Sequence, residues 1–219
     1  MSKAIAQRAH QLVKRLPEIY PDAHCELDYS NPLELLVATI LSAQCTDKRV
    51  NIVTPALFRR CPTAQAYADI SQEEIEELVR TTGFYRNKGK NIRAMGARLV
   101  ELHGGEVPRT MEELSALPGV GRKTANVVLG NAFGLDEGVV VDTHVSRLSL
   151  RLGLTKQTDP VKIEQDLVVL IPRPKWTLFS HWLIWHGRRR CQARKPDCPE
   201  CEIYDLCPTG PKLLRDKQA

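Results

Sequence analysis

Four cysteines close together in the last quarter of the chain restrict its fold most strongly. Cys191, Cys198, Cys201 and Cys207 form a C-x6-C-x2-C-x5-C pattern. Thiolates at such spacings can enclose one metal centre by closing successive short loops around it. Zinc ligands more often form two short C-x-x-C pairs separated by a long gap, and clustered thiolates suit an iron–sulfur cluster at least as well. The pattern therefore favours a metal centre over unrelated buried cysteines, and leaves zinc and iron–sulfur open.

The compartment follows from the cysteine count and the first residues. The total of seven cysteines is odd, and crowded thiols without a secretory leader favour metal binding over disulfides. Residues 1–16 predict an amphipathic helix rather than a signal or transit peptide. No apolar run is long enough to cross a bilayer. We therefore expect a cytoplasmic protein that does not use a membrane as a partner.

Charge is informative through its position rather than its total. The 31 Lys and Arg residues only modestly exceed the 26 Asp and Glu residues, which does not establish nucleic-acid binding. Basic residues gather beside and inside the cysteine pattern: Arg188, Arg190, Arg194 and Lys195. Such a run is ordinarily a solvated surface. Metal ligands on either side would turn it into a rigid basic loop suited to phosphates.

The regular structure is predicted to be helical throughout. Side chains that cap helices precede apolar residues at helical spacing, at Asn31, Thr46, Ser71, Thr110, Asp142 and Asp159. Pro55 predicts a kink or break in the second of these helices. Small residues between Gly89 and Gly96 predict a loosened helix there. The one strand-like run, 139–141, is too short to found a sheet, so the chain of 219 residues is predicted to be all-α.

A glycine-rich segment, Leu117-Pro-Gly-Val-Gly-Arg-Lys-Thr124, lies between two predicted helices. Gly119 and Gly121 permit a tight hairpin and let the backbone approach a ligand closely. The N–H groups at the start of the second helix favour an anion, and a phosphate of DNA fits there. An ordinary corner between helices is the alternative, since Gly-x-Gly alone is weak evidence.

This segment resembles the helix-hairpin-helix motif of DNA glycosylases. With the cysteine spacing and Val-Asp-Thr-His-Val at 141–145, the chain is similar to the endonuclease III family over nearly its whole length. The resemblance implies two helical domains flanking a DNA-binding cleft. One is a six-helix barrel domain at 24–134, with the helix-hairpin-helix at about 110–133. The other is discontinuous, 1–23 and 135–219, and carries a 4Fe-4S cluster on the four cysteines at 191–207.

The resemblance also implies that Lys123 is the nucleophile and Asp142 its partner. A neutral amine can displace a damaged base at the sugar C1′, form a Schiff base and cut the strand by β-elimination. An ordinary lysine, with a pKa of about 10.4, is protonated at neutral pH, and a helix N-terminus is expected to lower that pKa. Asp142, expected as an N-cap, could accept the proton. Taken singly, such a lysine is usually solvated and such an aspartate usually structural.

Further residues are expected to contact DNA. Gln44 and Phe84 occupy the positions that the family uses to fill the gap left by an extruded base. Packing in the core is an equal alternative for Phe84. His144 either lines the sugar site or is a packed histidine, and the hairpin supplies Gly119, Val120, Gly121 and Arg122. Cys25, Cys45 and Cys61 are read as buried apolar thiols.

These features favour a bifunctional DNA N-glycosylase and abasic-site lyase of base excision repair. The expected substrate is duplex DNA with an oxidised pyrimidine or an abasic site, and the expected enzyme is a nucleoid-associated monomer. An adenine-mismatch glycosylase relative is the first alternative, but it lacks the nucleophilic lysine found here at Lys123. A non-catalytic, redox-sensing DNA-binding protein is the second, and a zinc-ribbon module the third.

Overall fold

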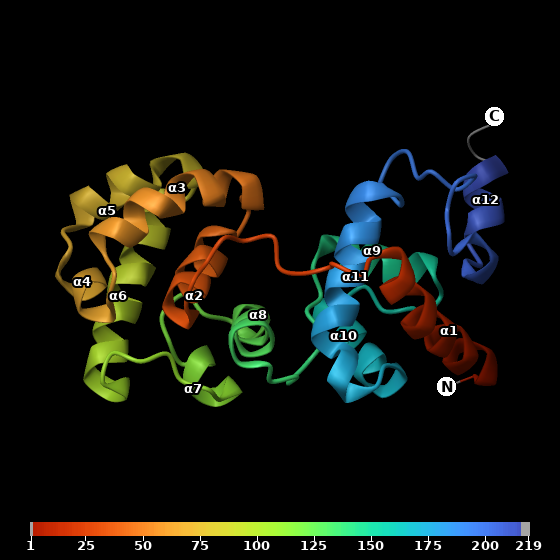
Figure 1. The fold of residues 1–219 in the computed structure, drawn as a ribbon, viewed down its shortest axis with the longest axis horizontal. Helices are drawn as coiled ribbons and strands as arrows, with labels where there is room; N and C mark the ends of the chain where they lie inside the picture. The colour runs from red at the N-terminus through yellow and green to blue at the C-terminus, as the bar shows by residue number, and fades with distance from the viewer. Residues whose placement is uncertain (1, 216–219) are drawn as a thin grey trace. The chain divides into compact units, whose positions relative to one another are not determined.

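All regular secondary structure in the described part of the chain, residues 2–215 of a computed structural model, is helical (Figure 1). The all-α prediction is therefore confirmed. Contacts divide the chain into two compact units, here called unit 1 and unit 2. Unit 2 is continuous, from Glu26 to Leu135, whereas unit 1 combines the residues up to Cys25 with those from Asp136 onward.

Each of the six predicted capping residues precedes a helix, and the two units contain further helices besides these. Unit 1 contains α1 (Lys3–Ile19), α9 (Thr143–Arg151), α10 (Pro160–Leu170), η2 (Arg173–Lys175), α11 (Trp176–Arg189), η3 (Tyr204–Leu206) and α12 (Gly210–Arg215). Unit 2 contains α2 (Pro32–Leu41), α3 (Asp47–Arg60), α4 (Ala64–Asp69), α5 (Gln72–Val79), η1 (Arg80–Thr82), α6 (Tyr85–His103), α7 (Met111–Ser115) and α8 (Arg122–Phe133).

Side-chain caps begin most of these helices. Asn31 Oδ1 accepts the backbone N–H of Glu34 at 3.0 Å, and Pro32 supplies a first residue that needs no N–H partner. Ser71 and Thr110 accept in the same way at the starts of α5 and α7. Each bond satisfies an N–H group that has no partner inside the helix, so the starts are encoded locally.

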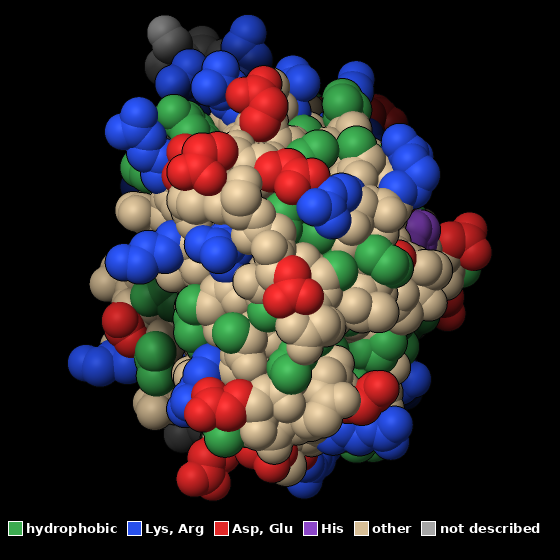
Figure 2. Space-filling model, turned by 90° about the vertical axis from the view of Figure 1, so that its left-hand side faces the viewer, with side chains coloured by type: hydrophobic (Ala, Val, Ile, Leu, Met, Phe, Trp, Pro, Cys, Tyr) green, Lys and Arg blue, Asp and Glu red, His purple; other side chains and the backbone are tan. Residues whose placement is uncertain are grey.

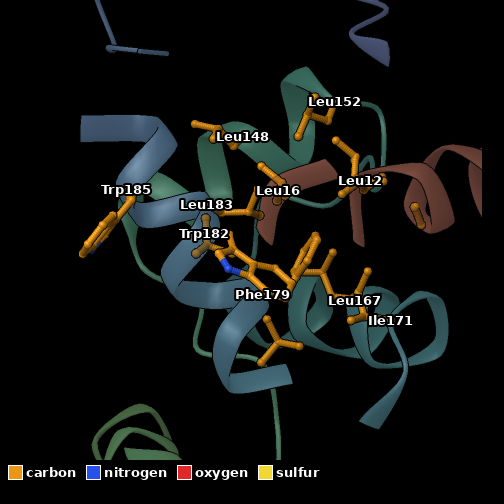
Figure 3. Packing of buried hydrophobic residues seen from close by; sticks show 14 of the residues in the cluster. Leu12, Leu16, Leu148, Leu152, Leu167, Ile171, Phe179, Trp182, Leu183 and Trp185 are labelled. Atoms are coloured by element: carbon orange, nitrogen blue, oxygen red, sulfur yellow. The ribbon is translucent and has the colours of Figure 1, made fainter. Parts of the chain in front are cut away.

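The core of unit 1 joins the two ends of the chain (Figure 3). Leu12 and Leu16 of α1 are fully buried in one cluster with Phe179 and Leu183 of α11. Burying each such side chain contributes about 1.5–3 kcal/mol relative to leaving it exposed. The N-terminal helix is therefore an integral part of the unit that contains the C-terminal segment.

Close packing of α4 against α6 is a feature of unit 2. A Cβ atom at Gly96 would lie 2.7 Å from Tyr67 Cβ and 2.8 Å from the Ala64 carbonyl oxygen, so only glycine fits. The expected loosening of this helix is not observed, since α6 runs unbroken from Tyr85 to His103. The small residues serve contact between helices instead.

One face of the molecule, on the side where α4, α5 and α6 lie, carries acidic and basic side chains interspersed with small hydrophobic areas (Figure 2). Such a mixture produces no field of a single sign that would attract a polyanion.

None of the helices in residues 2–215 is long and apolar enough to span a membrane.

Candidate functional site

The hairpin before α8 has a shape that requires glycine at one position and leaves the other open. Gly119 has φ +77°, and a Cβ atom there would lie 2.9 Å from Asn91 Cβ. Val120 is buried and its N–H bonds the Leu117 carbonyl at 3.1 Å, which closes the turn. Gly121 is the N-cap of α8, and nothing would lie within 4 Å of a Cβ atom there. The backbone at the start of α8 is thus open to a ligand.

Lys123 is the second residue of α8, and its side chain is exposed. Ala125, Val128 and Leu129 on the same helix are fully buried, which fixes the helix in unit 2. The first N–H groups of a helix lack partners within it and form its positive end. Lys123 therefore presents an amine to solvent beside a region that favours anions.

Asp142 is the N-cap of α9, as expected, in unit 1. Its Oδ1 accepts the N–H of Val145 at 2.8 Å, and its side chain is half-buried. The segment just before Asp142 is also fixed in place, because the N–H of Val140 donates to the Ser180 hydroxyl at 2.9 Å. The carboxylate is therefore oriented by the helix that it begins.

Arg147, one turn further along α9, ties this helix to the segment that enters the cysteine pattern. Its Nη2 donates to His144 Nδ1 at 3.2 Å and to the carbonyl oxygens of Gly187 and Cys191, each at 3.0 Å. Burial lowers the pKa of Arg147. His144 is thereby packed against α11. The sequence did not single out Arg147, although its spacing of three residues from His144 was the available signal.

The four patterned cysteines share one pocket, which is also lined by Leu148, Arg151, Leu152, His186, Ile203, Tyr204, Gly210 and Leu213. None of the seven cysteines forms a disulfide. Arg151 Nη1 donates to Cys191 Sγ at 3.2 Å and to the Gln192 carbonyl at 2.9 Å, so a cation steadies the first thiol and its loop. A charge-assisted donor beside sulfur suits a thiolate ligand.

The four thiols around this pocket are a suitable donor set for a metal centre. Among residues 2–215, no group of three or more His, Cys, Asp or Glu side chains already stands at the spacing of a metal-ion site.

The basic residues near the cysteines fall into two groups. Arg188, Arg194 and Lys195 line an open pocket together with His144 and Arg147. Arg190 behaves differently: its Nη1 donates to Asp197 Oδ2 at 2.6 Å and its Nη2 to Glu202 Oε1 at 2.8 Å. These two carboxylates raise its pKa, so the charge of Arg190 is compensated within the loop.

Gln44 and Phe84 share an unusual backbone conformation in unit 2. Their φ angles are +53° and +48°, and within residues 2–215 no other non-glycine residue has a positive φ. Both side chains are exposed, Phe84 by 64%, which excludes the core reading of Phe84. A left-handed conformation costs a non-glycine residue about 1–2 kcal/mol, and such strain gathers at functional sites.

The remaining cysteines differ from expectation. Only Cys61 is buried, with 2% exposure, while Cys25 and Cys45 are half-buried. Cys45 follows the strained Gln44 in the short connection between α2 and α3, where complete burial of a side chain is difficult. The prediction of three buried thiols is therefore wrong for two of them.

Known proteins resemble this chain in sequence over most of its length. A family described as "HhH-GPD superfamily base excision DNA repair protein" matches residues 37–173. Endonuclease III of Synechocystis sp. is 61% identical over 204 residues, which are 93% of each chain. Endonuclease III of Escherichia coli (strain K12) is 42% identical over 197 residues, covering 90% of this chain and 93% of its own.

Solved structures agree with these relatives. A non-covalent endonuclease III–DNA complex is similar with a TM-score of 0.91 and 45% identity, covering 96% of this chain and 98% of that chain. A trapped endonuclease III–DNA covalent intermediate is similar to the same degree, covering 99% of that chain. A thermostable thymine-DNA glycosylase, with a TM-score of 0.86 at 21% identity, shares the fold.

Proposed function

The chain belongs to the endonuclease III family, and we propose that it is a bifunctional DNA N-glycosylase and abasic-site lyase of base excision repair. The observation that carries this function is the exposed amine of Lys123 at the start of a helix that follows an open glycine hairpin. A relative that shares this fold and 45% of its sequence has been trapped as a covalent intermediate with DNA.

Lys123 would act as the nucleophile. Its neutral amine forms a bond to C1′ of the deoxyribose while the bond from C1′ to the base breaks, and the base leaves with that electron pair and gains a proton. The nitrogen lone pair then displaces the ring oxygen from C1′, the oxygen leaves with the electron pair of that bond and gains a proton, and a protonated Schiff base remains. Removal of a proton from C2′ then expels the 3′ phosphate by β-elimination, and water releases the sugar fragment from the lysine.

Asp142 would act on the same deoxyribose. Its carboxylate can take the proton of the Lys123 ammonium and can stabilise positive charge that develops on the sugar. The bond from Val145 N–H to Oδ1 holds the carboxylate in one orientation, so little reorganisation accompanies the reaction. The cap of α9 is therefore proposed to have a catalytic as well as a structural role.

DNA binding is proposed to use backbone and side chains from both units. In unit 2, Gly119, Val120, Gly121 and Arg122 would contact a phosphate at the start of α8, and Gln44 and Phe84 would fill the gap left by the base. In unit 1, Arg188, Arg194 and Lys195 would contact phosphates, with His144 beside them. Arg190 is assigned to the integrity of its loop, because two carboxylates already hold it. Oxidised pyrimidines are the proposed substrates.

The cysteine pocket is proposed to hold a 4Fe-4S cluster through Cys191, Cys198, Cys201 and Cys207. Four thiols in one pocket, none of them in a disulfide, support this assignment. When bound, the cluster would supply thiolate–iron bonds that cross-link the loops, and its role is proposed to be structural.

The remaining parts of the proposal concern organisation. Residues 24–134 would form the barrel domain, and residues 1–23 with 135–219 the cluster domain. The enzyme would act as a monomer on duplex DNA that contains a damaged base or an abasic site. Its place in the cell would be the cytoplasm, at the nucleoid, where that DNA is found.

Trapping the Schiff base tests the function directly. Wild-type protein incubated with abasic duplex DNA and borohydride should become covalently linked to the DNA, because reduction fixes the Schiff base. The Lys123→Ala variant should lose trapping and strand cleavage by at least about a thousandfold, while DNA binding stays within a few-fold. Normal cleavage by this variant would disprove the assignment.

Asp142→Asn provides a matched comparison. Asparagine caps helices as well as aspartate does, so α9 should keep its start and the variant its stability. Loss of the carboxylate should still lower base excision by about a hundredfold or more. Unchanged excision would remove Asp142 from the mechanism and leave only its role as a cap.

A further inference from the structure

Lys88 is a buried lysine of unit 2 that the mechanism above does not use. It lies beside two left-handed turns, at Gln44 and at Phe84, which are here called the two corners. Its side chain belongs to the first turn of α6, and the residue is only 5% exposed. The Nζ atom donates to the Leu41 carbonyl at 2.9 Å and to the Thr82 carbonyl at 2.7 Å. One ammonium therefore joins two segments that are far apart in sequence.

Both carbonyl groups stand at helix ends. Leu41 is the last residue of α2, and Thr82 is the last residue of η1. Terminal carbonyl groups have no partner within their helix, and a positive charge is favoured beside them. Gln44 follows Leu41 by three residues and Phe84 follows Thr82 by two. The ammonium thus anchors the chain immediately before each left-handed corner.

A buried ammonium is costly, which makes this arrangement informative. Burial lowers the pKa of Lys88, and the nearby Cys45 opposes that shift. A methionine would fill the space of the stem without a charge to desolvate, but it could not donate to either carbonyl group. The cost of burying the lysine is offset by satisfying both acceptors at once.

We propose that Lys88 is a positioning residue that locks the corners of Gln44 and Phe84 together, so that both side chains enter the duplex as one rigid unit when a base is extruded. This inference rests on the proposed function of these two side chains. Extrusion of a base loses a few kcal/mol of stacking and pairing. Side chains that are already ordered recover more of that loss, because no loop has to be immobilised at the moment of insertion.

The Lys88→Met variant tests this role, with Lys90→Met as the matched control. Lys90 is exposed on the same helix, so its substitution removes the same charge without touching either corner. Single-turnover excision of an oxidised pyrimidine should fall about tenfold or more in Lys88→Met. Cleavage of a preformed abasic site should stay within about threefold, since no base has to be extruded there. Lys90→Met should resemble wild type in both assays.

Coupling between residues separates positioning from a general loss of stability. If Lys88 acts through the corners, Lys88→Met should lower excision much less in a background that already carries Gln44→Ala and Phe84→Ala. A 2-aminopurine probe beside the lesion should also show less base extrusion in Lys88→Met. Equal loss of excision and abasic cleavage, or full additivity with the corner substitutions, would overturn the proposal.

Amide exchange on the wild-type protein provides a test that needs no variant to fold. The Cys45 N–H bonds Ser42 in one corner, and the Lys88 N–H bonds Phe84 in the other. If the ammonium locks both corners, these amides should open with one common free energy. Separate opening of the two corners would contradict the proposal. A wild-type protein inactive on both DNA substrates would instead contradict the proposed function, while leaving the exchange result intact.

Discussion

The two units build their helical cores from different parts of the chain. Unit 2 is one continuous stretch, in which α4 and α5 pack against α6, α7 packs against α8, and the first helix, α2, also packs against the last, α8. Unit 1 is assembled from both ends of the chain, with α1 packed among α9, α10 and α11. After α11, the described chain as far as Thr209 has only the short η3 as regular structure.

This difference indicates that the segment after α11 depends on contacts other than the packing of helices. The segment from Arg190 to Thr209 is held by side chains: Arg15 Nη1 pairs with Asp205 at 2.7 Å, and Arg190 pairs with Asp197 and Glu202. Exposed ion pairs contribute about 0–1 kcal/mol each. Such contacts are too weak to order a long irregular segment, so we expect the proposed cysteine-bound cluster to supply most of its stability.

Removal of one cysteine ligand should therefore produce the largest difference in stability between the two units. Cys198→Ala should destabilise unit 1 by several kcal/mol, because ligation in such loops is part of the folding free energy. Hydrogen exchange should show lost protection in the C-terminal segment and in α1, with α2 to α8 protected as in wild type. The brown colour expected of an iron–sulfur protein should be weakened or absent.

Cys61→Ala is the control for this substitution. Cys61 is a buried cysteine of unit 2 that lies outside the four-cysteine pocket. Its replacement should leave the colour and the protection of unit 1 unchanged, with only a modest local cost in unit 2. Equal loss from both units in Cys198→Ala would mean that the cluster does not stabilise unit 1 selectively.

Much of the fold could be predicted because helix starts are local. Asn31, Ser71, Thr110 and Asp159 each cap the helix that they precede, and the capping bonds span only three residues. Contacts from distant segments could not be predicted. A kink or break was expected at Pro55, but α3 continues through it, because the buried Val50, Val53 and Leu57 hold that helix in unit 2.

The candidate site, like the fold, has features that the sequence predicts and features that it does not. The positions of Lys123 and Asp142 at helix starts could be predicted, because a hairpin motif and a helix cap are visible as residue patterns. The contacts of Lys88 could not be predicted, since its partners are backbone carbonyl groups, which every residue possesses. The carboxylate partners of Arg190 could not be predicted for a related reason: they meet it only once the loop has folded.

Acid should weaken unit 1 before unit 2. Of the six histidines, only His181 and His186 are buried, and both belong to unit 1. Burial lowers the pKa of His181 from 6.5 to about 4, with a smaller contribution from the charge of His24. The unfolded chain therefore takes up the proton first as the pH falls. Stabilisation from neutral His181 is complete above about pH 6.5 and is lost progressively down to about pH 4.

At the acid end of this range, protonation linked to His181 lowers the free energy of unfolding by about 3 kcal/mol. Urea unfolding followed by tryptophan fluorescence measures it selectively, because all three tryptophans lie in α11 of unit 1. His181→Gln should reduce the pH dependence between pH 6.5 and 4 and leave the part from His186, whose pKa burial also lowers to about 4. An unchanged slope in this variant would show that His181 is not the group responsible.

The smallest effect concerns the packing of unit 2. An alanine in place of a helix-interior glycine ordinarily stabilises by about 0.5–1 kcal/mol. Gly96→Ala should instead destabilise by about 1–3 kcal/mol, because its Cβ atom would meet the Ala64 carbonyl oxygen at 2.8 Å and α4 would have to move.

Gly89→Ala on the same helix is the matched control for Gly96→Ala. The nearest atom to its Cβ would be Ile75 Cγ2 at 3.0 Å, which belongs to a side chain rather than to backbone. It should therefore cost less than Gly96→Ala. Differential exchange should place the loss from Gly96→Ala in α4 and α6, with tryptophan fluorescence of unit 1 unchanged. If both variants gained stability alike, close helix packing would not be what distinguishes unit 2 from unit 1.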